Sequence, residues 1–306
     1  MAGWRDELAS RLRGEVTRDA PLAPRTSIRV GGPADLLVKP ADPDDLAKLL
    51  RGCRDLGVPL LALGGGANLL VADEGVRGVV VKLPPDFGGE TVDGEALVLS
   101  AGAPIARLPA RAQALGLVGC EFMAGIPGTL GGATAMNAGT RAGELKDLVT
   151  RVEVATAHGA GWLEARELGF AYRTCRLRPG GVVTRVEVRL RPGDVARSAA
   201  VMQADKDHRR RTQPLTQPTF GSTFRNPPGD HAGRLVEAVG LKGHRIGGAA
   251  WSEVHANFVV NLGGASAADV VALIRLARSR VRERFDIALE PEVRLAGAFP
   301  DALKEI

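Results

Sequence analysis

The chain has 306 residues, enough for two domains, and its 45% hydrophobic and 25% charged content is ordinary for a globular protein. Its net charge of +5 comes with only 4% aromatic residues and no nucleic-acid-binding motif, which argues against a nucleic-acid-binding module. No apolar run reaches the roughly 18 residues of a membrane span, and residues 1–13 lack the apolar core of a signal peptide, so we expect a cytoplasmic protein without a membrane anchor. The three cysteines do not have the spacing of metal ligands, so we expect no metal site.

Taken in chain order, the periodic segments predict an α+β protein. Apolar periodicity and end signals predict helices over residues 5–13, 42–56, 104–115, 194–211 and 266–285. Short apolar or alternating runs predict strands over residues 59–63, 79–83, 97–100, 151–156, 182–190, 256–261 and 287–295. The sequence pattern changes at Pro192-Gly193, which predicts a boundary between a glycine-rich first domain (25–192) and a smaller second domain (193–306). Residues 1–24 are predicted to form an N-terminal extension.

Two glycine clusters stand out in the first predicted domain. The first, residues 63–70 (LGGGANLL), follows an apolar strand, and its three adjacent glycines would let the backbone approach a ligand and converge N–H groups on a phosphate. It is neither a dinucleotide-binding G-x-G-x-x-G nor a phosphate loop, so alone it fits a tight turn equally well. The second, residues 125–139 (GIPGTLGGATAMNAG), also carries apolar side chains and is no flexible linker. Two such segments together favour a ligand site for a flat or anionic group.

Read together, the clusters resemble the flavin-binding domain of the UDP-N-acetylenolpyruvoylglucosamine reductase (MurB) family, which has the vanillyl-alcohol-oxidase-like (PCMH-type) fold. Further matches follow in family order at residues 29–34 (RVGGPA), 172–173 (YR), 213–214 (QP), 221–227 (GSTFRNP), 240–243 (GLKG), 252–258 (SEVHANF) and 289–294 (LEPEVR). They cover nearly the whole chain. Tyr172 is the only tyrosine, so the chain resembles the shorter, second type of the family, without the inserted-segment tyrosine that clamps the substrate diphosphate in the other type.

The resemblance implies the fold, the cofactors and the reaction. The fold would be an FAD-binding domain of this type plus a smaller C-terminal α+β substrate domain. FAD would bind non-covalently to the two clusters, at Gly64, Gly65, Gly66, Ala67, Asn68, Leu69, Gly125, Ile126, Pro127, Gly128, Thr129, Gly131 and Gly132. NADPH would be the reductant, and the enolpyruvyl group of UDP-N-acetyl-enolpyruvoylglucosamine would become the lactyl ether of UDP-N-acetylmuramate in peptidoglycan precursor synthesis. The partners would be small molecules, the UDP-sugar and NADPH, and we expect a monomer.

Three catalytic roles are also implied by the resemblance. Arg173 would bind the substrate carboxylate and favour the more charged enolate, Ser222 would donate the proton to the substrate carbon, and Glu292 would hydrogen-bond the enolate or relay its proton. From the residues alone, Glu290 could share a face with Glu292, so it is the family pattern that selects Glu292. Ser222 lacks the G-x-S-x-G elbow of a hydrolase.

The candidate substrate contacts are Tyr172, Arg225, Asn226, Lys242, His255 and Asn257. For the last four, a purely structural polar role is an equal alternative. Arg225 stands where the family usually has lysine, so a planar guanidinium with several donors would replace a single ammonium charge. Ala67 stands where the family commonly has serine. The competing function is another FAD oxidoreductase of the same wider fold, such as an alcohol oxidase.

Overall fold

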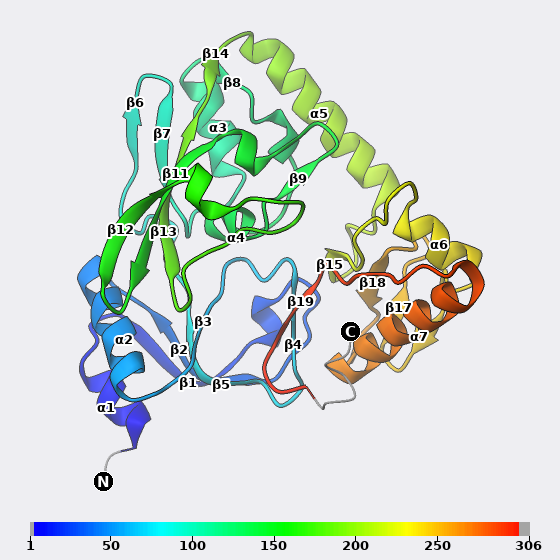
Figure 1. Ribbon diagram of the computed structural model, residues 1–306, viewed down its shortest axis with the longest axis horizontal. Helices are drawn as coiled ribbons and strands as arrows, with labels where there is room; N and C mark the ends of the chain where they lie inside the picture. The colour runs from blue at the N-terminus through cyan, green and yellow to red at the C-terminus, as the bar shows by residue number, and fades with distance from the viewer. Residues whose placement is uncertain (1–2, 300–306) are drawn as a thin grey trace. The chain divides into compact units, whose positions relative to one another are not determined.

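The computed structural model describes residues 3–299, so the outermost ends of the predicted extension and second domain, residues 1–2 and 300–306, lie outside the described part. The chain packs into two compact units that interleave along the sequence (Figure 1). The first unit contains Met1–Arg18, Asp35–Gly65 and Gly78–His208, and the second contains Asp19–Ala34, Gly66–Arg77 and Arg209–Ile306. The functional boundary at Pro192-Gly193 stays a prediction; packing groups two N-terminal segments with the C-terminal part.

A five-stranded antiparallel sheet with the order β12-β11-β13-β7-β6 forms the core of the first unit. Its strands are β6 (Thr91–Asp93), β7 (Ala96–Ser100), β11 (Val149–Thr156), β12 (Gly159–Glu164) and β13 (Val182–Arg189). Val152 pairs with Val186, which pairs with Leu99, and this row is fully buried, as expected where inward-facing side chains alternate along each strand. The predicted strands over 97–100, 151–156 and 182–190 are confirmed.

A second sheet with the order β1-β2-β5-β3 is formed by β1 (Glu15–Pro21), β2 (Pro33–Lys39), β3 (Leu60–Ala62) and β5 (Val76–Val81). The predicted helix over 42–56 is α2 (Pro43–Asp55), and Asp42 caps it by accepting a hydrogen bond from the Asp45 N–H at 2.9 Å. The helix buries Leu46, Leu49 and Cys53 in a shared core with this sheet. The N-terminal helix α1 (Trp4–Ser10) is shorter than predicted.

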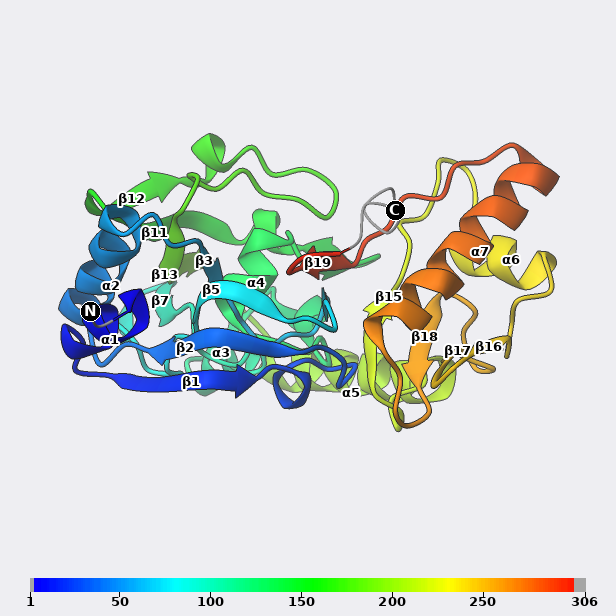
Figure 2. The same ribbon diagram turned by 90° about the horizontal axis from the view of Figure 1, so that it is seen from below.

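The second unit has an antiparallel sheet with the order β15-β18-β17-β16, whose strands are β15 (Thr219–Ser222), β16 (Arg245–Ile246), β17 (Ala249–Trp251) and β18 (Phe258–Asn261). The helices α6 (Ala232–Ala238) and α7 (Ala267–Phe285) share its hydrophobic core, and Figure 2 shows α7 running alongside β17 and β18. The predicted capping box of α7 is confirmed, since Ser266 and Asp269 each accept the other's backbone N–H.

The last predicted strand is wrong in extent. Only β19 (Arg294–Ala296) is a strand, and it pairs in parallel with β4 (Leu69–Val71). Before it, Pro291 forms an isolated bridge with Phe224, flanked by one backbone hydrogen bond on each side. Proline has no N–H with which to build a ladder, so the segment is extended but not part of a regular sheet.

The remaining elements connect these layers. They are η1 (Ala23–Arg25), α3 (Arg107–Ala114), β8 (Leu117–Val118), η2 (Glu121–Met123), α4 (Leu130–Ala135), β9 (Gly139–Thr140), β10 (Gly143–Glu144), η3 (Leu145–Asp147), η4 (Ala165–Leu168), β14 (Arg191–Pro192) and α5 (Val195–Thr212). Within residues 3–299, none of the helices combines the length and the apolar character that crossing a bilayer requires.

Candidate active site

The two glycine clusters pack against each other in the first unit. A Cβ atom on Gly65 would lie 2.5 Å from the Cα of Gly128, and one on Gly64 would lie 2.5 Å from the Oγ1 of Thr129. Real Cβ atoms do not approach other atoms this closely, so glycine at position 65 allows the two loops to meet backbone to backbone, and glycine at position 64 leaves room for the Thr129 hydroxyl. From the sequence, the missing side chains fit either a ligand or a tight turn; the structure adds that the loops need glycine to contact each other.

The second cluster is a fixed loop followed by a helix. Its residues Gly125 and Gly128 have φ angles of +77° and +114°, which side chains other than hydrogen rarely adopt. The Gly128 carbonyl accepts the Ile105 N–H at 3.0 Å, and Thr129 caps α4 by accepting the Gly132 N–H. Residues 130–135 of this cluster, over which the sequence predicts no helix, are helical despite their poor helix propensity.

The first cluster offers backbone donors. In the described part of the chain, the N–H groups of Gly64, Gly65 and Gly66 donate to no protein acceptor. Lys82, which the sequence analysis missed, donates from Nζ to the Gly64 carbonyl at 3.1 Å and so brings a positive charge to this turn. Open N–H groups beside a cation are the chemistry that a pyrophosphate requires, so the cluster fits FAD.

The loop crosses into the second unit at Gly66, and there it holds the segment that carries Glu292. The side chain of Asn68 donates to the Glu292 carbonyl at 3.0 Å, and the Arg294 N–H donates to the Asn68 carbonyl at 3.2 Å. These bonds lead directly into the β4–β19 pair. A residue of the candidate cofactor loop therefore fixes the backbone of the candidate acid.

Ser222 and Glu292 lie on neighbouring segments of the second unit. Ser222 ends β15 after Gly221, whose φ of +85° turns the chain, and the Glu292 N–H donates to the carbonyl of Thr223 at 2.8 Å. Glu292 is half-buried, whereas the Glu290 side chain is 75% exposed and its Oε2 lies 3.6 Å from the Arg225 guanidinium. The geometry thus distinguishes the two carboxylates that the sequence alone could not.

Two of the candidate substrate contacts of the second unit already form hydrogen bonds to the protein backbone. Asn257 is buried, and its amide both accepts from the Phe224 N–H at 3.0 Å and donates to the Phe224 carbonyl at 2.8 Å. Asn226 accepts the N–H of Ala232 at the start of α6. These bonds hold the backbone around the predicted site, which is the structural alternative that the sequence left open.

Lys242 and His255 differ in exposure: Lys242 lies on the surface, whereas His255 is partly buried. The Lys242 ammonium is exposed and lies 3.0 Å from Glu237. Burial lowers the pKa of His255 below its usual value, and its Nδ1 accepts the Asn257 N–H at 3.2 Å, so the neutral ring carries its proton on Nε2.

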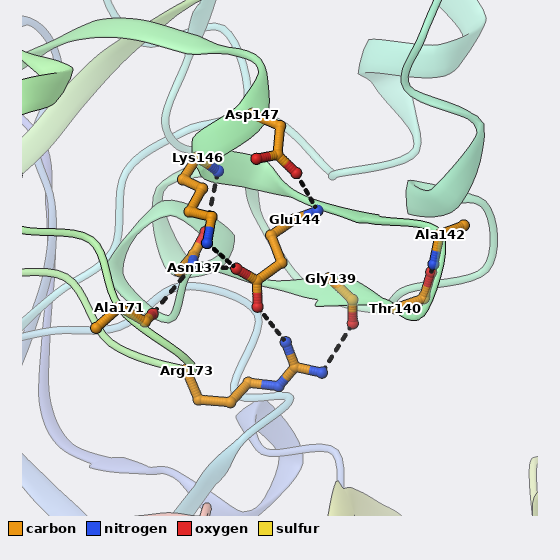
Figure 3. Close-up of polar contacts among 9 residues, drawn as sticks. All are labelled: Asn137, Gly139, Thr140, Ala142, Glu144, Lys146, Asp147, Ala171 and Arg173. Atoms are coloured by element: carbon orange, nitrogen blue, oxygen red, sulfur yellow. Dashed lines mark hydrogen bonds and ion pairs between the residues drawn. The ribbon is translucent and has the colours of Figure 1, made fainter.

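Tyr172 and Arg173 lie in the first unit, in a tight turn between Ala171 and Thr174. Tyr172 is 45% exposed, and the Arg173 guanidinium carbon lies 5.0 Å from the centre of its ring. Figure 3 shows that the guanidinium points to Gly139 and Glu144. The predicted site residues therefore divide between the units. Gly64, Gly65, the second glycine loop and Arg173 belong to the first, and residues 66–69, Ser222 and Glu292 belong to the second.

Comparison with known proteins gives a family match for each of two long segments of the chain. Residues 34–161 match the model of an FAD binding domain, and residues 213–296 match that of the C-terminal domain of UDP-N-acetylenolpyruvoylglucosamine reductase. A crystal structure of the reductase (MurB) from Thermus caldophilus superimposes with a TM-score of 0.79 at 39% identity, covering 93% of this chain and 99% of that one. The predicted α+β fold class, with an FAD-binding domain and a C-terminal domain, is confirmed.

Curated relatives agree with these matches. The UDP-N-acetylenolpyruvoylglucosamine reductase of Anaeromyxobacter dehalogenans (strain 2CP-C) is 74% identical over 97% of this chain and 90% of its own length. That of Myxococcus xanthus is 53% identical over 97% of this chain and 99% of its own length. The chain is an FAD-dependent oxidoreductase, and it belongs to the UDP-N-acetylenolpyruvoylglucosamine reductase family.

Proposed function

We propose that the protein uses NADPH to reduce UDP-N-acetyl-enolpyruvoylglucosamine to UDP-N-acetylmuramate, and that this step supplies peptidoglycan precursors in the cytoplasm. The observation that carries the proposal is the hydrogen bond between Glu292 and Thr223, which joins the candidate acid to the segment of the candidate proton donor Ser222. The bond from Asn68 to the Glu292 carbonyl links the same pair to the flavin loop.

The glycine loops would hold the cofactor. The N–H groups of residues 64–66 and the loop of residues 125–132 would contact the FAD pyrophosphate, with Lys82 contributing its charge. When bound, FAD supplies the relay of hydride from NADPH to the terminal carbon of the enolpyruvyl group. We expect the cofactor to be released by heat or acid, because the matched segments show no evident histidine for covalent attachment.

The side chains would stabilise charge and deliver a proton. Arg173 would bind the substrate carboxylate, where its fixed charge favours the enolate that forms after hydride addition. Ser222 would then protonate the carbon next to the carboxylate. The proton lost from the hydroxyl must be replaced, and Glu292, whose segment is bonded to that of Ser222, would replace it.

The UDP-sugar would be bound by polar side chains around this centre. Tyr172, Arg225, Asn226, Lys242 and His255 stay the predicted contacts. Asn257 also stays a predicted contact, although both ends of its amide already bond to Phe224, so its contribution would be mainly to hold the Ser222 segment. A monomer remains our expectation.

The test is a product analysis with the FAD-loaded protein. NADPH and the enolpyruvyl UDP-sugar are incubated with it under argon, NADPH absorbance is followed, and the sugar is analysed by mass spectrometry. The proposal requires one lactyl product, heavier than the substrate by two hydrogens, for each NADPH oxidised. An enzyme whose flavin is reduced by simple alcohols without NADPH, and which leaves the UDP-sugar unchanged, would instead be an alcohol oxidase of the same wider fold.

A further inference from the structure

The carboxylate of Glu144 is the centre of a polar cluster in the first unit. Glu144 belongs to the short hairpin of β9 and β10, in which it pairs with Gly139. Its Oε2 accepts from the Asn137 amide at 3.0 Å and lies 2.8 Å from the Lys146 ammonium, and its Oε1 lies 3.9 Å from Nη1 of Arg173 (Figure 3). One half-buried carboxylate therefore connects three other side chains.

Arg173 is held at two points by the same hairpin. Its Nη2 donates to the carbonyl of Gly139 at 2.9 Å, while Nη1 faces Glu144, the residue paired with Gly139 in the hairpin. The backbone of Arg173 has a φ of +57°, a left-handed conformation that is disfavoured for a residue other than glycine. A disfavoured conformation persists only where the surroundings fix it, so the orientation of this side chain is strongly determined.

Asn137 ties the turn of Arg173 to Glu144. It is fully buried, and its Nδ2 donates both to Glu144 and to the carbonyl of Ala171, which opens the turn, at 3.0 Å each. Its Oδ1 accepts the Lys146 N–H at 2.9 Å. Asn137 also lies within the second glycine cluster, so the candidate flavin loop and the turn of Arg173 share one hydrogen-bonded network.

The ion pair between Arg173 and Glu144 is partly shielded from solvent. The Arg173 and Glu144 side chains are 17% and 18% exposed, so solvent screens their attraction less than that of a surface pair. At 3.9 Å the contact is an ion pair rather than a hydrogen bond, and Lys146 shares the negative charge of Glu144. The Asp147 carboxylate, which accepts the Glu144 N–H at 2.9 Å, is a second negative charge in the cluster, so its two cations and two carboxylates balance.

We infer that Glu144 is a positioning residue, which together with Asn137 fixes the guanidinium of Arg173 for the carboxylate of the enolpyruvyl substrate. The inference rests on the proposed function and deepens it. Glu144 would act only through Arg173, after the flavin has been reduced. The alternative is a merely structural role, since the Glu144 side chain also caps η3 together with Asp147.

A double-mutant cycle on the FAD-loaded enzyme separates the two roles. Glu144→Gln, Arg173→Gln and the double variant are compared for binding of UDP-N-acetylmuramate by calorimetry and for both half-reactions by stopped flow. We expect Glu144→Gln to weaken product binding and slow reoxidation by about 10-fold, without changing flavin reduction by NADPH. In the Arg173→Gln background the same substitution should change neither by more than about 2-fold.

The matched control is Glu187→Gln. Glu187 forms a comparable ion pair with Arg151 in the sheet of the same unit, at 2.6 Å and with the carboxylate 13% exposed. It should leave product binding and both half-reactions unchanged. If Glu144→Gln does not fold, Glu144→Asp, which keeps the charge on a shorter side chain, provides the same cycle.

Two results would overturn the inference. One is an equal effect of Glu144→Gln with and without Arg173, and the other is an equal slowing of flavin reduction and reoxidation. A wild-type enzyme that reduces the UDP-sugar, together with a slow Arg173→Gln and a normal Glu144→Gln, removes this inference but not the proposed function. A wild-type enzyme that neither binds the product nor reduces the sugar removes the proposed function itself.

Discussion

In the two glycine clusters the predicted binding surface consists of backbone, whereas around Ser222 and Glu292 the backbone serves to hold side chains. Gly65 meets Gly128 with no room for a Cβ atom, and the N–H groups of residues 64–66 donate to no acceptor within residues 3–299. After Ser222, the backbone groups are already bonded within the protein: the buried Asn257 amide bonds to the N–H and carbonyl of Phe224, and the Glu292 N–H bonds to the carbonyl of Thr223.

This difference predicts which kind of substitution each region resists. Adding any side chain to the clusters should remove the cofactor as a whole, because the two loops could no longer meet. Around Ser222, removing one functional group should leave the cofactor in place and stop one chemical step. The predictions below test that contrast, beginning with the largest expected effect.

Gly65→Val and Gly128→Val should abolish FAD binding. At Gly65 the new side chain would collide with Gly128, and at Gly128 it would also require a φ of +114°. Flavin content of the purified protein, measured by absorbance after acid release, is the readout. Gly161→Val is the control, since a Cβ atom there meets nothing within 4 Å. Full flavin occupancy in a folded Gly65→Val protein would show that this loop is only a turn.

Ser222→Ala should slow only the second half-reaction. Loss of a positioned proton donor typically costs about 10² to 10⁴-fold, and the serine acts after hydride has left the flavin. Stopped-flow absorbance should therefore show near-normal bleaching by NADPH and very slow reoxidation by the UDP-sugar. Ser279→Ala, which removes a hydroxyl bonded to Glu283 on α7, should change neither phase. Slow reduction with intact reoxidation would contradict the assigned role.

Glu292→Gln should show the same division between half-reactions, with reoxidation slowed by about 10²-fold, because the amide cannot replace the proton of Ser222. Glu290→Gln is the matched control on the same segment. Its carboxylate is largely exposed, and we expect both phases to stay normal. Should Glu290→Gln be the variant that fails to reoxidise, the family pattern has been placed on the wrong carboxylate.

Asn257→Ala should act mainly through stability. The substitution leaves the N–H and the carbonyl of Phe224 buried without partners, at a cost of about 1–3 kcal/mol in the free energy of unfolding. Urea denaturation measures this cost, and reoxidation should slow less than in Ser222→Ala. Unchanged stability combined with weak binding of the UDP-sugar would show that Asn257 is a direct substrate contact.

Among these predictions, we expect the smallest effect from lowering the pH, which should reduce the free energy of unfolding slightly. Burial lowers the folded-state pKa of His255 below its usual value of 6.5. As the pH falls through 6.5, the unfolded chain therefore binds a proton on His255 before the folded chain does, and the free energy of unfolding decreases. The free energy of unfolding should fall more in the wild type than in His255→Gln between pH 7.5 and 5.5. Equal losses in both proteins would mean that His255 is not buried as described.

Local signals made much of the fold predictable. The caps of α2 and α7 lie in the sequence at Asp42 and Ser266, and both form as expected. The helix α4 was missed because glycine, alanine and threonine give no periodic signal, and its cap is Thr129 within a cluster interpreted as a loop. The extent of the last strand was misjudged because Pro291 permits a bridge but no ladder.

The candidate site was predictable where it repeats a family motif and not where it depends on distant contacts. Lys82, Asn137 and Glu144 carry no motif of their own; their importance lies in bonds to Gly64, Ala171 and Arg173. The interleaving of the two units depends on the pairing of Leu69 with Arg294, which no local pattern indicates.

The central claim is that one chain accepts hydride from NADPH on its flavin and passes it to an enolpyruvyl UDP-sugar. An anaerobic spectral titration of the purified, FAD-loaded protein tests this most directly. NADPH should bleach the flavin absorbance, and one equivalent of the enolpyruvyl UDP-sugar per flavin should restore it in full. A flavin that stays bleached when the sugar is added, or that NADPH does not bleach, would contradict the account.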